Sequence, residues 1–138
     1  MRLRALAARV LRFAAVGAVG TLAHYALLIA LVEGAGADPV AGSVAGFAIG
    51  AVVNYALGRR LVFDSGRAHA EALPRFFAVA GVGLVMNGLL MRAFTVGLGA
   101  HYGLAQVLTT GLLVLWHYAG NAVWTFRHKA PAGDAANL

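Results

Sequence analysis

The sequence NYALGRRLVF, residues 54–63, decides the fold. It follows an uncharged, glycine-rich apolar run from Val40 to Val53, and polar residues come directly after it. An asparagine, an aromatic side chain and paired arginines at the end of an apolar run are typical of a transmembrane helix that reaches the membrane–water interface. A related stretch, HYAGNAVWTF, lies 63 positions later (118 − 55) at residues 117–126, with a tyrosine, an alanine and the closing phenylalanine in register. We therefore predict that the chain contains one unit twice.

The composition indicates a protein that lies in lipid. Of the 138 residues, 61% are hydrophobic and 12% are charged, which is about half the charged fraction of an ordinary soluble domain. The net charge is +6, and the basic residues flank long apolar runs. Anionic lipid head groups explain that distribution better than nucleic acid, which we do not expect as a partner. The chain has no cysteine, which excludes disulfides and thiol chemistry.

The apolar runs predict four membrane-spanning helices. A helix of about 20 residues, rising about 1.5 Å per residue, crosses the roughly 30 Å hydrocarbon core. Short glycine-containing connections join the first run to the second and the third to the fourth, so each pair predicts an antiparallel hairpin. The expected spans are 13–32, 40–58, 76–96 and 103–123. They form a four-helix membrane domain over 13–126, with a polar middle loop at about 59–75 and a disordered tail at 127–138.

The first twelve residues carry four arginines among apolar residues. Two interpretations remain open: a short amphipathic helix lying on an anionic membrane surface, or a basic cytoplasmic leader that sets orientation. The apolar run that follows, 13–32, is longer than the core of a signal peptide, so we expect a spanning helix and no cleaved leader.

The distribution of lysine and arginine predicts the orientation. These residues gather at the N-terminus, in the middle loop and near the C-terminus, while the two short connections hold none. Positive residues stay on the cytoplasmic side, so both termini and the middle loop should be cytoplasmic. Each unit, about 12–63 and 75–126, holds two spans, so both units enter the membrane the same way round. The fold class is thus an all-α membrane protein built as a parallel tandem repeat of helical hairpins.

Glycines mark one helix face of the second span. Gly42, Gly46 and Gly50 lie four residues apart, beside Ser43, and this spacing lets helix backbones approach closely. Four helices leave little room between them for a bound head group, so we expect a homo-oligomer. This glycine face is a candidate for the contact between subunits.

Polar side chains inside the spans are costly in lipid and are therefore candidates for function. Two pairs occupy equivalent places in the two units, since His24 and Asn87, like Asn54 and His117, are 63 residues apart. For Gln106, Thr109 and Thr110 we favour interhelical hydrogen bonding as a sufficient explanation. The candidate polar path through the membrane comprises His24, Asn54, Tyr55, Asn87, His117, Tyr118 and Asn121.

Arginines near the ends of the spans are candidates for binding an anionic head group. Positive-inside anchoring alone would place Arg59 and Arg60 where they are, but paired guanidiniums also suit a phosphate or diphosphate. Arg92 lies near the outer interface, where it can pair with Glu33 or contact a phosphate on the outer side. The full candidate set is Arg12, Arg59, Arg60, Arg75 and Arg92.

No catalytic constellation is visible in the sequence. There is no cysteine nucleophile, no pair of carboxylates within the spans, no metal-ligand spacing on a shared helix face and no glycine loop that would cradle a phosphate. We expect no enzymatic activity, no bound metal and no cofactor.

The two related stretches resemble those of the GtrA-like family of small four-helix membrane proteins. Units of that family open with Arg-Phe on a glycine-rich helix and close with an Asn-aromatic-x-x-Asn-basic-x-aromatic-x-Phe pattern. The first unit here offers Asn54, Tyr55, Arg59 and Phe63, with Gly58 and Leu61 departing from the pattern. The second offers Tyr118, Asn121, Trp124 and Phe126, with His117 in place of the first asparagine and Ala122 in place of the basic residue. The resemblance covers roughly 12–127.

The resemblance implies translocation, or assistance in translocation, of a polyprenyl-phosphate-linked sugar across the bacterial inner membrane. The sugar would then serve the synthesis or modification of cell-surface polysaccharide. The implied partners are the sugar lipid, anionic lipids and a membrane glycosyltransferase. No nucleotide-binding motif is present, so movement would run downhill or be driven by consumption of the sugar outside.

Two alternatives come from other functional classes. The chain could be a non-transporting assembly partner that holds a glycosyltransferase at the membrane. It could also be a small proton-coupled exporter of cations, but that chemistry needs a carboxylate inside the bilayer. Glu33 lies at the edge of the first span and His24 occupies its middle, so this second alternative is the weaker one.

Overall fold

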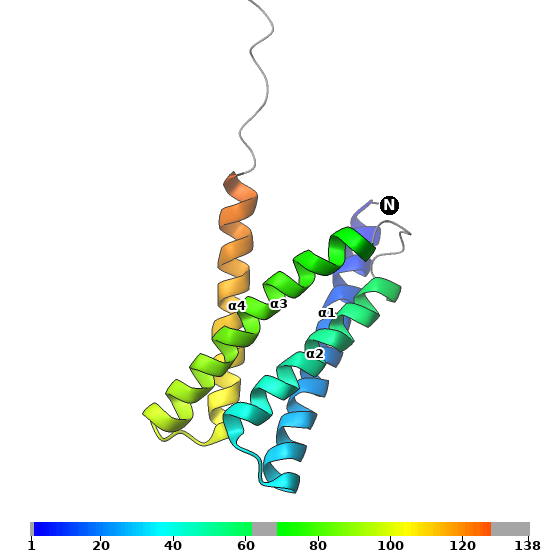
Figure 1. The fold of residues 1–138 in the computed structure, drawn as a ribbon. Helices are drawn as coiled ribbons and strands as arrows, with labels where there is room; N and C mark the ends of the chain where they lie inside the picture. Colours follow the sequence, from blue (N-terminus) through cyan, green and yellow to red (C-terminus); the bar gives the residue numbers. More distant parts are fainter. Residues whose placement is uncertain (1, 62–68, 128–138) are drawn as a thin grey trace, which may run out of the picture.

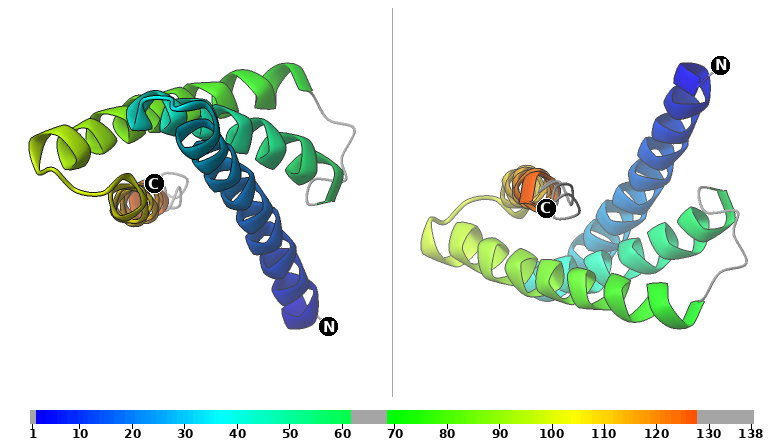
Figure 2. Two further views of the ribbon diagram at one scale, coloured as in Figure 1. Left: turned by 90° about the horizontal axis from the view of Figure 1, so that it is seen from below. Right: turned by 90° about the horizontal axis from the view of Figure 1, so that it is seen from above.

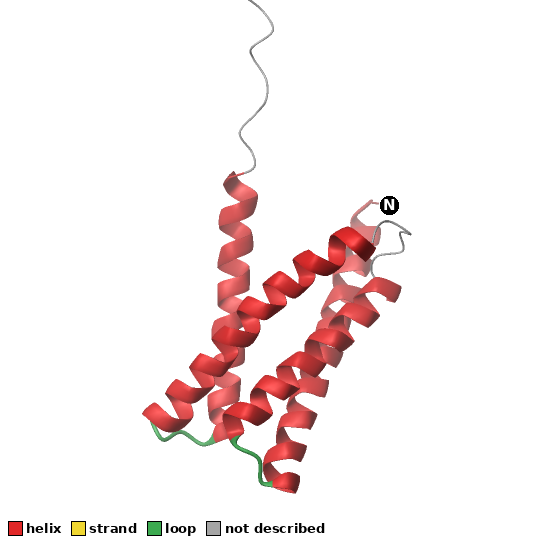
Figure 3. Ribbon diagram, viewed as in Figure 1, coloured by secondary structure: helices red, strands yellow, loops and turns green. Residues whose placement is uncertain are grey.

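The computed structural model describes residues 2–61 and 69–127, and all of them lie in helices or in the short loops that join helices (Figure 3). The prediction of an all-helical fold is confirmed for these residues. The elements in order are α1 (Arg2–Ile29), η1 (Ala30–Gly34), α2 (Pro39–Leu61), α3 (His69–Arg92), η2 (Ala93–Gly97) and α4 (Tyr102–Arg127).

The helices coincide with the predicted spans. By length and composition, Arg2–Gly34, Pro39–Leu61 and Phe76–Gly97 can each cross a membrane. Tyr102–Trp116 is a shorter apolar helix, and α4 itself continues to Arg127. The chain is therefore a membrane protein with several apolar helices.

Two boundaries differ from the sequence-based expectation. Residues 2–12 do not form a separate helix, because α1 runs without a break from Arg2 to Ile29 over 28 residues. At about 1.5 Å per residue this is roughly 42 Å, longer than the hydrocarbon core, so α1 extends beyond it. The predicted middle loop at 59–75 was too long, because α2 continues through Arg60 and α3 begins at His69. The alanines, Glu71 and Leu73 that open α3 favour a helix there. Residues 62–68 and 128–138 lie outside the described residues.

The two hairpin loops are built alike. The π-helical turns η1 and η2 begin 63 residues apart (93 − 30), the offset at which the sequence matches itself. Gly36 and Gly99, also at that offset, have φ angles of 64° and 66°, which glycine adopts without strain. Asp38 then caps α2, since its Oδ2 accepts a hydrogen bond of 3.0 Å from the Ala41 N–H. In both hairpins, therefore, the first helix ends and the second helix begins at equivalent positions of the sequence.

The helices converge at one end of the molecule and spread at the other (Figures 1 and 2). We call the end with loops 35–38 and 98–101 the loop end, and the end with the start of α1 and the end of α4 the termini end. Along the chain each helix packs on the next, α1 on α2, α2 on α3 and α3 on α4. The start of α1 and the end of α4 diverge from α2 and α3 toward the termini end, as both views in Figure 2 show.

A seam of glycines holds α1 against α2. A Cβ placed on Gly46 would lie 2.6 Å from the His24 carbonyl oxygen, and one on Gly50 would lie 2.8 Å from the Gly20 carbonyl oxygen. Backbone thus touches backbone, which is the role that the spacing predicts. The same glycines are buried inside the subunit, so the suggestion that Gly42, Gly46 and Gly50 form a contact between subunits is wrong.

The seam makes a prediction for two matched alanine substitutions. Gly46→Ala forces a methyl group against the His24 carbonyl, so α1 and α2 must separate at a cost of about 1–3 kcal/mol. Gly17→Ala places its methyl where nothing lies within 4 Å, so it should be neutral or stabilise the helix by up to about 1 kcal/mol. Thermal unfolding of the detergent-solubilised variants measures both. Equal melting temperatures for the two variants would contradict the close backbone contact of α1 and α2 at Gly46.

Candidate functional site

Three side chains from three helices form a closed hydrogen-bonded group in the interior. The Ser43 hydroxyl on α2 donates to Oε1 of Gln106 on α4 in a short hydrogen bond. The Asn87 Nδ2 on α3 donates to the Ser43 Oγ at 2.7 Å, and the Gln106 Nε2 donates to the Asn87 Oδ1 at 3.2 Å. Each of the three residues is at most 1% exposed. The two amides and the hydroxyl thus bond to one another.

Tyr25 extends this group to α1. Its hydroxyl lies 2.6 Å from the Thr110 Oγ1 on α4 and 3.4 Å from the Gln106 carbonyl oxygen. The Gln106 Nε2 also lies within 3.4 Å of the Thr110 Oγ1. All four helices therefore contribute to one polar network, which we define as Tyr25, Ser43, Asn87, Gln106 and Thr110.

The network lies toward the loop end of the bundle. Ser43 is the fifth residue of α2 and Gln106 the fifth of α4, so both are about 6 Å along the helix from its start. Most of the network's bonds join the α1–α2 hairpin to the α3–α4 hairpin. In lipid such bonds are worth about 0.6 kcal/mol each and at most about 2 kcal/mol. The network thus links the two hairpins where the helices converge.

His24 lies beside the network without completing it. Its side chain is 7% exposed, and Ser43 and Gln106 are the polar groups that face it. Its Nε2 has no hydrogen-bond partner among the described residues, and the same holds for the Thr109 Oγ1. Buried polar atoms without partners are costly, so each one calls for an explanation.

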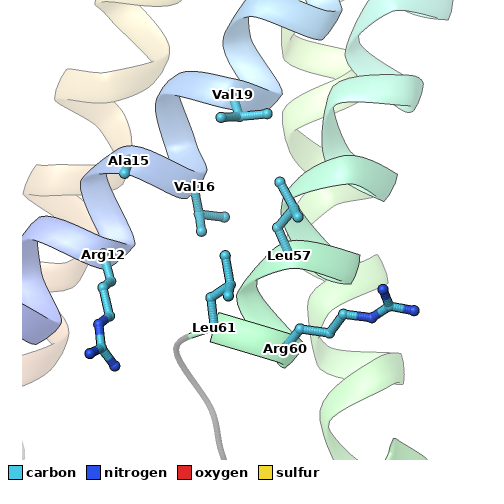
Figure 4. Close-up of a pocket in the computed structure, with 7 residues that line it drawn as sticks. All are labelled: Arg12, Ala15, Val16, Val19, Leu57, Arg60 and Leu61. Atoms are coloured by element: carbon cyan, nitrogen blue, oxygen red, sulfur yellow. The ribbon is translucent and has the colours of Figure 1, made fainter.

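A second feature is a groove at the termini end between α1 and α2 (Figure 4). Its volume is about 570 Å³, within the range of about 300–1,000 Å³ that is usual for small-molecule sites. Val16, Leu57 and Leu61 point into the groove, and Arg12 and Arg60 extend on either side of them. The complete lining is Arg12, Ala15, Val16, Val19, Leu57, Arg60 and Leu61. The groove thus combines apolar walls with two cations near its rim.

Two other predicted head-group arginines, Arg59 and Arg92, do not join Arg12 and Arg60 in lining the groove. Arg59 is exposed and does not line the groove. Arg92 is exposed in the last turn of α3, at the loop end. Glu33, suggested as its partner, instead accepts a 2.7 Å hydrogen bond from the Tyr102 hydroxyl. The side chain of Arg75 lies outside the described residues.

The described residues of the predicted polar path lie in different environments and do not form one continuous path. Asn87 belongs to the network and His24 lies beside it, whereas Tyr55 packs on Phe76 with ring centroids 5.1 Å apart. Asn54 lies against Gly20, where a Cβ would overlap its side chain, and its Oδ1 has no partner among the described residues. The side chains of His117, Tyr118 and Asn121 lie outside the described part of the chain.

Sequence reasoning did not select Ser43 or Tyr25 as site residues, and it favoured a purely structural reading of Gln106. One signal was available for Ser43 and Gln106, which are 63 residues apart. They form an equivalent pair just as His24 and Asn87 do. Tyr25 carries no comparable signal, because an aromatic residue in an apolar span is unremarkable by itself.

The network predicts a loss of stability when its centre is removed. Asn87→Leu deletes the bonds to Ser43 and Gln106 and leaves their polar atoms without partners in an apolar interior, at a cost of about 1–3 kcal/mol. Thr21→Ala is the control, because the Thr21 hydroxyl is exposed and bonds to Gly17 of its own helix. Thermal unfolding in detergent should separate the two variants. An unfolding midpoint for Asn87→Leu equal to that of the control would contradict the network.

Comparison with known proteins gives one match. The family model described as GtrA/DPMS, transmembrane domain, matches residues 12–126. No curated protein and no solved structure matches the chain. The matched region includes the network, the groove and both hairpins. The chain belongs to the GtrA/DPMS transmembrane domain family.

Proposed function

We propose that the protein binds a polyprenyl-phosphate-linked sugar and moves it, or helps to move it, across the bacterial inner membrane for cell-surface polysaccharide synthesis or modification. Membership of the GtrA/DPMS transmembrane domain family supports the handling of a lipid-linked sugar. The observation that carries the proposal is the groove. Its apolar lining suits the prenyl chain of such a lipid, and its arginines suit the phosphate.

The chemistry of the groove fits a prenyl phosphate. Val16, Val19, Leu57 and Leu61 offer branched apolar surface to the first isoprene units. Arg12 and Arg60 belong to the lining, and their guanidinium groups point away from its apolar residues (Figure 4). Guanidinium groups bind phosphate through charge-assisted, often bidentate hydrogen bonds. Both arginine side chains are exposed and long enough to turn toward a head group at the mouth. With the phosphate at the rim, the sugar would remain in water at the termini end.

The hairpins support a tandem duplication with both copies threaded in the same direction. The matched π-turns, the positive-φ glycines and the Ser43–Gln106 pair all fall at the sequence offset of 63. We further propose that the termini end faces the cytoplasm, because Arg2, Arg4, Arg9, Arg12, Arg59 and Arg60 gather there. Arg92 at the loop end would then contact the phosphate on the outer side. A homo-oligomer and a membrane glycosyltransferase remain proposed partners.

The groove arginines predict a selective loss of transport. In vesicles that carry a polyprenyl-phosphate-linked hexose, Arg12→Gln and Arg60→Gln should each lower the transfer rate by about tenfold or more, since a hydrogen bond to a charged group contributes about 1.5–3 kcal/mol. Arg59→Gln is the matched control, with the same charge removed one residue away and outside the groove. It should leave transfer within about twofold of the wild type.

Equal losses in all three variants would mean that net charge matters and that the groove does not. If the wild-type protein moves no sugar lipid yet co-purifies with a glycosyltransferase, the transport proposal fails and the assembly-partner function takes its place. Detergent-solubilised protein should be checked for intact folding in each case by thermal unfolding.

A further inference from the structure

The network and the groove occupy opposite halves of the bundle. From Arg12 to His24 is about 18 Å along α1, so the groove at the rim and the network beside His24 are separated by more than half of the hydrocarbon core. The helices spread at the termini end and converge at the loop end (Figure 1). The network therefore lies in the half of the bundle where the helices converge.

The contact between the two hairpins at the loop end is polar. Tyr25, Asn87, Gln106 and Thr110 could be replaced by apolar side chains of similar volume without any hydrogen bond being required. Hydroxyls and amides differ from apolar groups in one relevant respect: they can exchange their mutual bonds for bonds to another polar molecule at little net cost. A cluster that only held the helices together would gain nothing from this property.

We propose that the network is a gate at the loop end, which opens between the two hairpins to pass a phosphate-linked head group whose sugar is neutral and bears hydroxyls. This inference rests on the proposed transport of a sugar lipid and names the class of sugar. The five members, Tyr25, Ser43, Asn87, Gln106 and Thr110, are all uncharged hydroxyls and amides.

The bonds that must break are those between the hairpins. Ser43 to Gln106, Asn87 to Ser43 and Tyr25 to Thr110 each join α1 or α2 to α3 or α4, whereas Gln106 to Asn87 lies within one hairpin. Sugar hydroxyls both donate and accept, so they can replace each of these bonds. His24 lies beside the network, and its buried Nε2 has no hydrogen-bond partner among the described residues. This atom offers one bonding position before any network bond is broken. Every such lipid brings one negative charge with its phosphate, and a uronic acid adds a second. The network members offer no cation for this second charge, so a carboxylate-bearing sugar should pass poorly.

Thiol labelling tests the gate directly, because the natural chain has no cysteine. Thr109 is a suitable reporter: it lies one turn beyond Gln106 from the loop end, its side chain is fully buried, and its hydroxyl has no partner to lose. Thr109→Cys in sealed proteoliposomes is exposed to a membrane-impermeant thiol reagent on the side of the hairpin loops. Ala35→Cys, in the exposed loop, identifies that side and gives the labelling rate of an open position.

The reporter should label slowly by itself and about tenfold faster when Gln106→Leu or Ser43→Ala is added, because either change removes bonds between the hairpins. Adding Thr95→Ala is the control, since the Thr95 hydroxyl bonds only to Met91 of its own helical segment. A polyprenyl-phosphate-linked neutral hexose should also speed labelling, and the matching uronic acid lipid should not.

Equal labelling in the reporter, the gate variants and the control would overturn the gate. Equal acceleration by the neutral and acidic lipids would overturn its selectivity. If the gate variants speed labelling but neither lipid does so, the gate stands and the proposed sugar-lipid function fails. Ser43→Ala changes little volume, so a misfolded Gln106→Leu variant does not remove the test.

Discussion

Polar groups inside a lipid-embedded bundle must find their hydrogen bonds within the protein, and this constraint organises the structure. Ser43, Asn87 and Gln106 satisfy one another in a group that is almost wholly buried, and Tyr25 brings the first helix into contact with it through Thr110. Lipid offers no competing partners, so the bonds of the network hold all four helices together at one depth. The rest of the bundle is free to spread away from that point.

Small side chains decide where the bundle stays closed. Between α1 and α2 the seam consists of Gly42, Gly46 and Gly50, so the backbones touch. The positions 63 residues further on hold Ala105, Thr109 and Leu113, all buried and all bulkier. α4 diverges from α3 toward the termini end (Figure 2). The α1–α2 hairpin is therefore the one that packs through glycine.

The architecture was largely predictable from the sequence because lipid imposes simple rules. Apolar length located the helices, glycine and proline located the hairpin loops, and the offset of 63 anticipated the matched turns. The ends of the helices were harder to predict. Arg59 and Arg60 were assigned to a loop but continue α2, since a helix can extend past the hydrocarbon core into the interface.

The site was only partly predictable. Asn87 was selected through its equivalence to His24, but the bonding partners of a side chain depend on helix rotation, which hydropathy does not determine. Gly42, Gly46 and Gly50 were identified as a packing face, yet their spacing could not say which helix packs there.

We propose that a prenyl phosphate occupies the groove between α1 and α2, next to Arg12 and Arg60. Photo-crosslinking with a polyprenyl phosphate that carries a diazirine on its first isoprene unit tests this most directly, with the labelled residues identified by mass spectrometry. The account predicts labels on α1 around residues 12–19 and on α2 around residues 57–61, suppressed by excess unlabelled lipid. Labels spread evenly over the lipid-facing surfaces of all four helices, or insensitive to competition, would contradict it.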